Sequence, residues 1–195
     1  MIFFIFIIVM IILSGGLFAV VANSASSSET KESNTNKNFA FITDFSDRFK
    51  QEISTIKNVY GFDVPNSLIL AVIRQESGSK VFTKQNKDVI GDLNLSSKSF
   101  GYMQVREPAL IDVNMAFGTN FKESDLLNEQ NNLIVGIAYL QLCYNRARLA
   151  NTDNVVKLTL QKYNAGVGTK ETSFRGKSYA NSAFNFYQEF QGVVV

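Results

Sequence analysis

One glutamate of this sequence stands where a carboxylate could transfer protons. Within Pro65–Ser77, Glu76 follows four apolar residues at spacings of three, four, seven and eight positions, namely Ile73, Val72, Ile69 and Leu68. Helical periodicity puts the Glu76 carboxylate on the same inward face, at the last turn. Partial burial and the negative end of the helix dipole raise the pKa of a carboxylate, which keeps it protonated for general acid catalysis. A structural interpretation stays open, in which Glu76 turns to solvent or pairs with Arg74 or Lys80.

The composition excludes several other kinds of chemistry. The 195 residues include no His and one Cys. A Ser-His-Asp triad, a Cys-His pair, a His-ligated metal, an intramolecular disulfide and a thiolate metal cluster are therefore ruled out. Cys143 lies in the apolar stretch LQLCY, so we expect it to be buried packing. With 19 basic and 17 acidic residues, the net charge of +2 does not indicate a nucleic-acid partner.

The chain begins with an apolar segment, residues 1–22. Residues 2–22 carry no charge and, as a helix rising about 1.5 Å per residue, would span roughly 30 Å, the thickness of a bilayer's hydrocarbon core. This predicts either an uncleaved membrane anchor or a secretory signal cleaved near Ala22. No Lys or Arg precedes the apolar run, which favours the anchor. In both cases we expect the rest of the chain to work outside the cytoplasm, in the periplasm or at the cell exterior.

The remaining chain divides into a linker and one domain. Residues 23–38 are polar and lack aromatic side chains, which predicts a flexible tether. Residues 39–195 predict a mainly helical domain with a small irregular or β-hairpin segment near 80–100, around Val89–Leu95. Asp63 is the expected N-cap of the helix that carries Glu76. The six expected helices are Ile42–Val59, Pro65–Ser77, Pro108–Phe117, Glu129–Ala147, Asp153–Tyr163 and a last one with the stripe Tyr179, Ala183, Phe186 and Phe190.

Four short blocks occur in a fixed order along this domain. They are AVIRQES at Ala71–Ser77, FGYMQV at Phe100–Val105, NNLIVGIAYL at Asn131–Leu140 and KYNAG at Lys162–Gly166. In this order the sequence resembles the lytic transglycosylases of the soluble-lytic-transglycosylase (SLT) type, which are related to goose-type lysozyme. The resemblance covers about Val64–Phe190 and implies a mainly α, lysozyme-like α+β fold. It also implies a peptidoglycan substrate and no metal or cofactor.

The resemblance assigns roles to particular residues. Glu76 matches the catalytic acid and base of that family. Seven further positions match residues beside it or lining the sugar groove: Ser77, Gly101, Met103, Gln104, Tyr163, Asn164 and Tyr179. Tyr163 also continues an apolar stripe, so its ring is partly core and its hydroxyl is free to bond a carboxylate or a sugar. Lys98-Ser99 and Tyr102 depart from the family pattern, and the interval between Glu76 and Gly101 is long, which leaves the subsite preference open.

The reaction implied by the resemblance is cleavage of the β-1,4 bond between N-acetylmuramic acid and N-acetylglucosamine, with closure of a 1,6-anhydro ring. Two alternatives stay open. One is a hydrolase in which Asp88 or Asp92 positions water, and the other is an inactive, membrane-anchored wall-binding or assembly protein. The setting is also open, because wall turnover, secretion or conjugation machines and phage entry, where the protein would be virion-associated, all use such domains.

Overall fold

The computed structural model describes residues 42–77, 98–150 and 152–192. The predicted anchor or signal segment, 1–22, and the linker, 23–38, lie outside these residues. In the part of the chain that is described, no helix is long and apolar enough to cross a membrane. The chain divides into two compact units, Met1–Asp44 and Phe45–Val195, and the elements that form the site belong to the second.

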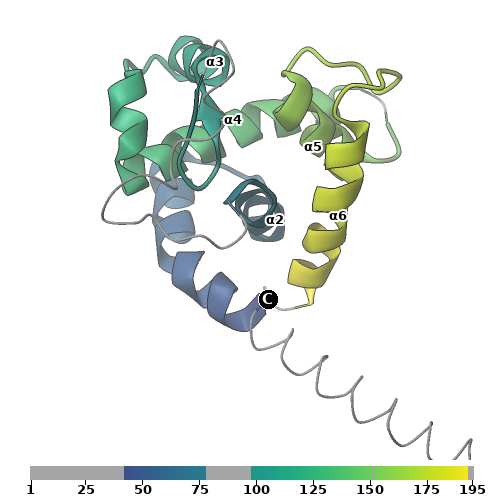
Figure 1. Cartoon of the computed structure of the whole chain (residues 1–195), viewed down its shortest axis with the longest axis horizontal. Helices are drawn as coiled ribbons and strands as arrows, with labels where there is room; N and C mark the ends of the chain where they lie inside the picture. Colours follow the sequence, from purple (N-terminus) through teal and green to yellow (C-terminus); the bar gives the residue numbers. More distant parts are fainter. Residues whose placement is uncertain (1–41, 78–97, 151, 193–195) are drawn as a thin grey trace, which may run out of the picture. The chain divides into compact units, whose positions relative to one another are not determined.

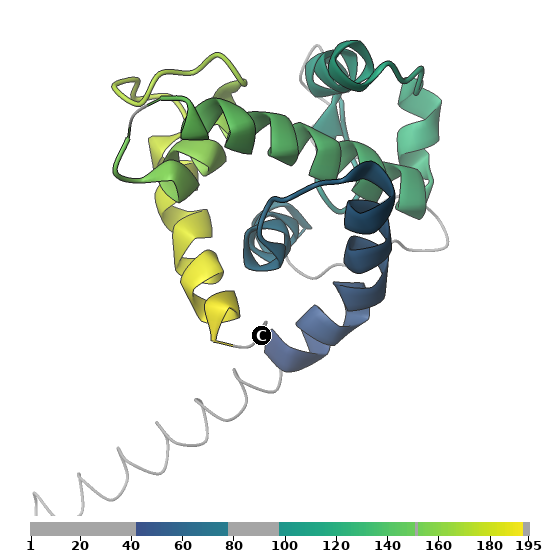
Figure 2. The same cartoon turned by 180° about the vertical axis from the view of Figure 1, so that it is seen from behind.

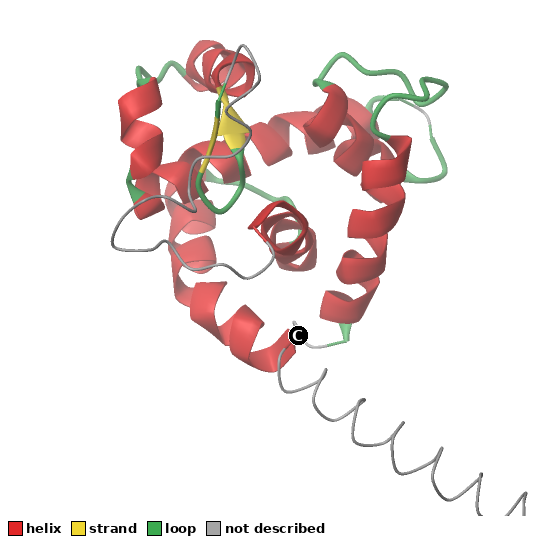
Figure 3. Cartoon of the chain, viewed as in Figure 1, coloured by secondary structure: helices red, strands yellow, loops and turns green. Residues whose placement is uncertain are grey.

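The described residues form a mainly α, lysozyme-like fold with a small antiparallel sheet, as the sequence predicts. A first helix covers residues 42–60. The following elements are α2 (Asn66–Ser77), β1 (Ser99–Phe100), β2 (Val105–Arg106), α3 (Glu107–Phe117), the 3-10 helix η1 (Glu123–Leu127), α4 (Glu129–Arg148), α5 (Val155–Ala165) and α6 (Lys177–Gln191). Figure 3 shows how the helices dominate.

Helix α2 lies at the centre of the second unit. Residues 45–60 of the first helix, together with α4, α5 and α6, surround it in two opposite views (Figures 1 and 2). This central position agrees with the burial of α2, in which every residue from Ser67 to Ile73 is buried. Because burying apolar side chains is the main favourable term in folding, such a helix is stable only when other helices cover it on most sides.

Helix α4 connects the two sides of the unit. It runs from the side of α3 and the hairpin to the side of α5 (Figures 1 and 2). Its first turn is capped by Asn128, whose side chain accepts a hydrogen bond from the backbone N–H of Asn131 at 3.0 Å. Cys143 of α4 is fully buried, which confirms the packing role expected for it. The active-site groups described below come from elements on both sides of this helix.

Two local predictions differ from the structure. Asp63 does not cap α2, because its carboxylate accepts hydrogen bonds from Gln141 at 2.6 Å and Arg148 at 2.7 Å, both on α4. The Pro65 carbonyl instead accepts hydrogen bonds from backbone N–H groups of the first turn of α2. In the described hairpin, β1 pairs with β2. Only β1 lies within the predicted interval 80–100, and β2 follows that interval. The segment Val89–Leu95, where a hairpin was expected, lies outside the described residues.

Candidate active site

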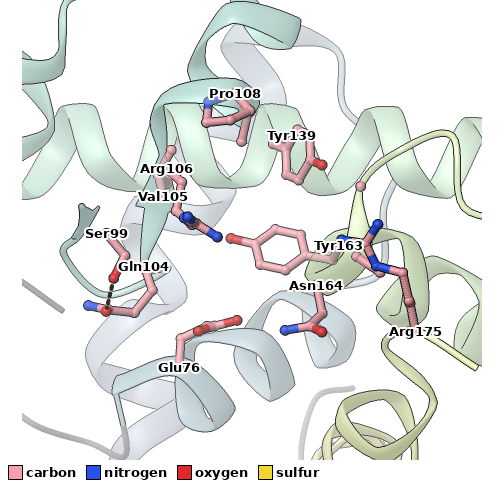
Figure 4. A pocket seen from close by; sticks show the side chains of 13 residues that line it. Glu76, Ser99, Gln104, Val105, Arg106, Pro108, Tyr139, Tyr163, Asn164 and Arg175 are labelled. Carbon is pink, nitrogen blue, oxygen red and sulfur yellow. Dashed lines mark hydrogen bonds between the residues drawn. The ribbon is translucent and has the colours of Figure 1, made fainter. Parts of the chain in front are cut away.

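The last turn of α2 carries Glu76 into a pocket of about 380 Å³. The four apolar residues that predicted its direction, Leu68, Ile69, Val72 and Ile73, are all fully buried. Glu76 itself is half-buried and is one of the pocket-lining residues. Figure 4 shows its side chain on one side of the pocket and Tyr139 of α4 on the opposite side.

Desolvation controls the protonation of Glu76. Its surroundings raise the pKa of the carboxyl group from 4.5 to about 7, and a smaller influence of the Tyr179 hydroxyl acts in the opposite direction. Burial has this effect because the charged form loses more hydration than the neutral form. Although one side of Glu76 is open to the pocket, packed protein surrounds the rest of the side chain. At neutral pH the group is therefore partly protonated, so that it can both donate and accept a proton.

The pocket walls come from α2, which carries Glu76, and from five other parts of the chain. The hairpin supplies Ser99 and Gln104 at one end, and Arg175 lies at the other end (Figure 4). The remaining residues that line it are Val105 and Arg106 of β2, Pro108 and Ala109 of α3, Tyr139 of α4, and Tyr163, Asn164, Ala165 and Gly166 at the end of α5. Glu76 is the single carboxylate among the described residues that line this pocket.

Gly101 and Met103 lie behind the pocket wall and do not line it. A Cβ atom on Gly101 would lie 2.1–2.4 Å from the Asn132 side chain, and the backbone φ of Gly101 is +71°. Both facts require glycine at this position. Met103 is fully buried, and its side chain packs so closely on Gly136 that a Cβ atom there would lie 2.5 Å from its sulfur. The sequence prediction that these two residues bind substrate directly therefore has no counterpart in the pocket wall.

Asn132, inside the third sequence block, holds this turn in place. Its amide nitrogen donates to the Phe100 carbonyl at 2.8 Å, and its amide oxygen accepts from the Met103 N–H at 3.2 Å. Asn132 is fully buried on α4. Leaving a buried amide without these partners would cost free energy, so the two hydrogen bonds hold the turn against α4.

Gln104, which lines the pocket, has a strained backbone conformation. Its φ of 45° is the only positive value of a non-glycine residue in the described chain. Its side chain accepts a hydrogen bond from the Ser99 hydroxyl at 2.8 Å and donates one to the Gly101 carbonyl at 2.8 Å. Backbone strain of this kind persists where the surrounding contacts fix the conformation. Here the strained conformation directs the side-chain amide of Gln104 to one end of the pocket.

Tyr163 and Asn164 lie together at the end of α5, as predicted. The Tyr163 hydroxyl donates to the Met103 carbonyl at 2.7 Å, so its donor is used within the protein. Its ring also packs against Tyr139, with centroids 5.4 Å apart. Burial, followed by the nearby charge of Glu76, raises the pKa of Tyr163 well above its usual value. Asn164 is exposed in the pocket and can contact a ligand.

Tyr179 brings a second hydroxyl to Glu76 from α6. This hydroxyl is buried and has no hydrogen bond of ordinary geometry to the described residues. It is nevertheless close enough to Glu76 to lower the pKa of that carboxyl group, and the Glu76 charge in turn contributes to raising the pKa of Tyr179. A buried hydroxyl without a partner is costly, and a catalytic role is one of the explanations for such a group. A substrate oxygen or the carboxylate itself could supply the partner.

Ser77 has a local structural role. Its hydroxyl donates to the Ile73 carbonyl of α2 at 2.8 Å, and Ser77 is not among the residues that line the pocket. The hydroxyl therefore satisfies an acceptor in the last turn of the helix that carries Glu76.

Three residues that line the pocket were not identified from the sequence, namely Arg175, Tyr139 and Arg106. Arg175 lies in the loop between α5 and α6, which has no regular periodicity. The signal that could have indicated it is the pair of polar residues at Gln161 and Lys162, which are buried and donate to backbone carbonyls of that loop. Within the described ranges, no cluster of acidic residues or cysteine could hold a metal ion.

The comparisons with known proteins agree with this arrangement. The transglycosylase SLT domain family matches residues 54–185, more than half of the 195 residues. The chain therefore belongs to this family, and the resemblance inferred from the four sequence blocks is confirmed.

Among solved structures, the chain is similar to an inactive glutamate-to-glutamine mutant of the lytic transglycosylase Slt from Pseudomonas aeruginosa. The TM-score is 0.51 and the sequence identity is 17%, so the likeness concerns the fold. It covers 74% of this chain and 24% of the Slt chain, about a quarter of the length of that protein. None of the curated protein sequences matches this chain.

Proposed function

We propose that this protein is a peptidoglycan lytic transglycosylase in which Glu76 is the single catalytic acid and base. The observation that carries the proposal is a glutamate whose pKa is raised to about 7, in an open pocket of a chain that belongs to the transglycosylase SLT domain family. The substrate would be the β-1,4 bond between N-acetylmuramic acid and N-acetylglucosamine.

The proposed reaction needs one carboxyl group and no added water. Glu76 donates its proton to the glycosidic oxygen while the bond from that oxygen to the muramic anomeric carbon breaks. The muramic 6-hydroxyl then attacks the anomeric carbon and gives its proton to the Glu76 carboxylate. The products are a free 4-hydroxyl on N-acetylglucosamine and a 1,6-anhydromuramic end, and Glu76 is again protonated. A pKa near 7 suits a group that acts first as an acid and then as a base.

The lining of the pocket supports an internal nucleophile. An inverting hydrolase needs a second carboxylate about 6.5–9.5 Å from the acid to activate water. Among the described lining residues, Glu76 alone carries a carboxylate. The substrate's own 6-hydroxyl is held beside the anomeric carbon, which gives it a high effective concentration. Asp88 and Asp92, the candidates for a hydrolase, lie outside the described residues, and they define the alternative reaction.

Uncharged polar groups of the pocket would hold the sugars. Asn164 is exposed and lines the pocket, and Gln104 lines it at the end formed by the hairpin (Figure 4). Amide groups suit the N-acetyl and hydroxyl groups of the glycan because they both donate and accept hydrogen bonds. The buried Tyr179 hydroxyl would bond the Glu76 carboxylate after the first proton transfer, when negative charge develops there.

The cellular location forms part of the proposal. The apolar segment 1–22 supports attachment to a membrane, or export through one, with the catalytic domain in the periplasm or at the cell exterior. Peptidoglycan is found there. A role in a secretion or conjugation machine or in phage entry, where the protein would be virion-associated, is compatible with the same arrangement.

Product analysis tests the reaction type. Purified sacculi are digested with the protein from residue 39 onward, and the fragments are analysed by mass spectrometry before and after borohydride reduction. We expect mainly anhydro ends, which borohydride does not reduce. A majority of reducible ends, lost in Asp88→Asn or Asp92→Asn, would establish hydrolysis with water positioned by an aspartate.

A further inference from the structure

A second hollow lies next to the catalytic pocket. It measures about 450 Å³ and is formed by the loop between α5 and α6. Three residues, Ala165, Gly166 and Arg175, line both hollows. Because they share this wall, a ligand bound beside Glu76 could extend directly into the second hollow.

Buried polar side chains hold this loop in one shape. The amide nitrogen of Gln161 donates to the Ser173 carbonyl at 2.7 Å and to the Arg175 carbonyl at 3.0 Å. The ammonium group of Lys162 donates to the Val167 carbonyl at 3.1 Å and also to that of Thr169. These contacts fix the loop before any ligand arrives, so little ordering entropy is lost on binding.

The charge of the second hollow is positive. Lys170 and Arg175 line it, together with the hydroxyl-bearing residues Thr169, Thr172 and Ser173. The acidic residue of the same loop, Glu171, is not among the lining residues. Its carboxylate accepts a hydrogen bond from Thr152 at 2.7 Å and faces a different hollow. The described lining therefore combines two cations with neutral donors, a set that suits a carboxylate ligand.

We propose that this basic hollow binds a carboxylate of the stem peptide attached to the muramic sugar. The inference rests on the proposed function, which places the glycan in the neighbouring pocket. The sugars of the strand are uncharged once the lactyl group of muramic acid is joined to peptide, so the negative charges of the substrate are on the peptides. Arg175, shared by both hollows, is positioned between the sugar site and the peptide site. The chain would thus prefer glycan whose stem peptides carry free carboxylates over glycan whose peptide carboxylates are neutralised.

Three substitutions alter the hollow in independent ways. Lys170→Gln and Arg175→Gln remove one charge each. Gly168→Phe keeps the charge and fills the space, because a Cβ atom on Gly168 would meet nothing within 4 Å. Lys50→Gln is the matched control, since Lys50 is an exposed cation of the first helix that lines neither hollow. Thermal melting of all four variants shows whether each is folded.

The measurement is kcat/KM on peptide-bearing glycan strands and on the same strands after their stem-peptide carboxylates have been converted to amides, which keeps the lactyl group joined to peptide and therefore uncharged. We expect the ratio of the two values to fall about tenfold in each of the three hollow variants and to stay unchanged in Lys50→Gln. For Lys170→Gln and Arg175→Gln the reason is the loss of a charge-assisted hydrogen bond, and for Gly168→Phe it is the loss of the space that the carboxylate would occupy. A ratio that stays the same while both rates fall equally would overturn the peptide site and leave the transglycosylase proposal intact. A wild-type protein that cleaves neither substrate would overturn both.

Discussion

The hydroxyl of Tyr163 donates a hydrogen bond to the main-chain carbonyl of Met103 at 2.7 Å, across 60 positions of sequence. This contact joins the end of α5 to the turn between β1 and β2. It thereby connects two of the four sequence blocks and links the pocket wall that holds Gln104 to the one that holds Asn164.

Replacing Tyr163 by Phe should lower both stability and activity. The Met103 carbonyl is buried, and without its donor the free energy of unfolding should fall by about 1–3 kcal/mol. The rate should fall as well, since the residue after Met103 lines the pocket. Urea denaturation and kcat/KM on peptidoglycan measure the two effects. Tyr60→Phe, which removes a hydroxyl from an exposed ring, should change neither. Unchanged stability in Tyr163→Phe would show that the contact to Met103 contributes nothing.

Gly101→Ala should destabilise the protein by more than about 2 kcal/mol. The new methyl group would overlap the Asn132 side chain and force it from its partners, Phe100 and Met103. Gly118→Ala provides the matched control, because Gly118 has a similar φ of +64° but open space around its Cβ position. It should cost only the backbone strain, roughly 1 kcal/mol. Equal melting temperatures for the two variants would contradict a specific role of the contact with Asn132.

The sequence was sufficient to predict the central helix and the direction of Glu76. Local periodicity determines which face of α2 is buried, and Glu76 follows that face by one turn. The end of α5 was predictable for the same reason, since Tyr163 continues an apolar stripe. The likeness of the four blocks to a known family then indicated which positions meet in space.

Long-range contacts account for what the sequence did not predict. Asp63 has the residue type and place of a helix cap, yet its carboxylate is bound by Gln141 and Arg148, 78 and 85 positions away. The position of Arg175 depends in a similar way on the buried amide of Gln161. Gly101 and Met103 belong to a block that was expected to line the groove. The small size of Gly101 and the buried side chain of Met103 instead serve the packing of the turn on α4.

The protonation of Glu76 predicts a pH dependence of stability. The pKa of Glu76 in the folded state is about 7, above the ordinary 4.5, so the folded protein binds more protons than the unfolded chain between these values. Stability should therefore fall as pH rises from about 4.5 to 7. In Glu76→Gln this loss is absent, so the variant should gain roughly 2–3 kcal/mol relative to wild type between pH 4 and pH 8. Thermal melting at both pH values measures this gain, and parallel curves would contradict the raised pKa.

Tyr179→Phe should shift the pH profile of activity. The Tyr179 hydroxyl lowers the pKa of Glu76, so its removal should move the alkaline limb of kcat/KM to higher pH. The maximum rate should fall if this hydroxyl bonds the carboxylate during the reaction. Stability should be kept or slightly improved, because the buried hydroxyl has no ordinary hydrogen bond within the described chain. Tyr187→Phe on the same helix is the control. If the alkaline limb of kcat/KM in Tyr179→Phe lies at the same pH as in the wild type, Tyr179 does not act on Glu76.

The central claim is that Glu76 transfers the proton in both steps, and its direct test is the activity of Glu76→Gln on purified peptidoglycan. The amide has the shape of the carboxyl group but can neither give nor take the proton. We expect the release of soluble fragments by the protein from residue 39 onward to fall at least a thousandfold, roughly the contribution of general acid–base catalysis. Glu52→Gln, at an exposed glutamate of the first helix, should keep full activity. A folded Glu76→Gln variant that retains a tenth of the wild-type rate would contradict the assignment of Glu76 as the catalytic acid and base.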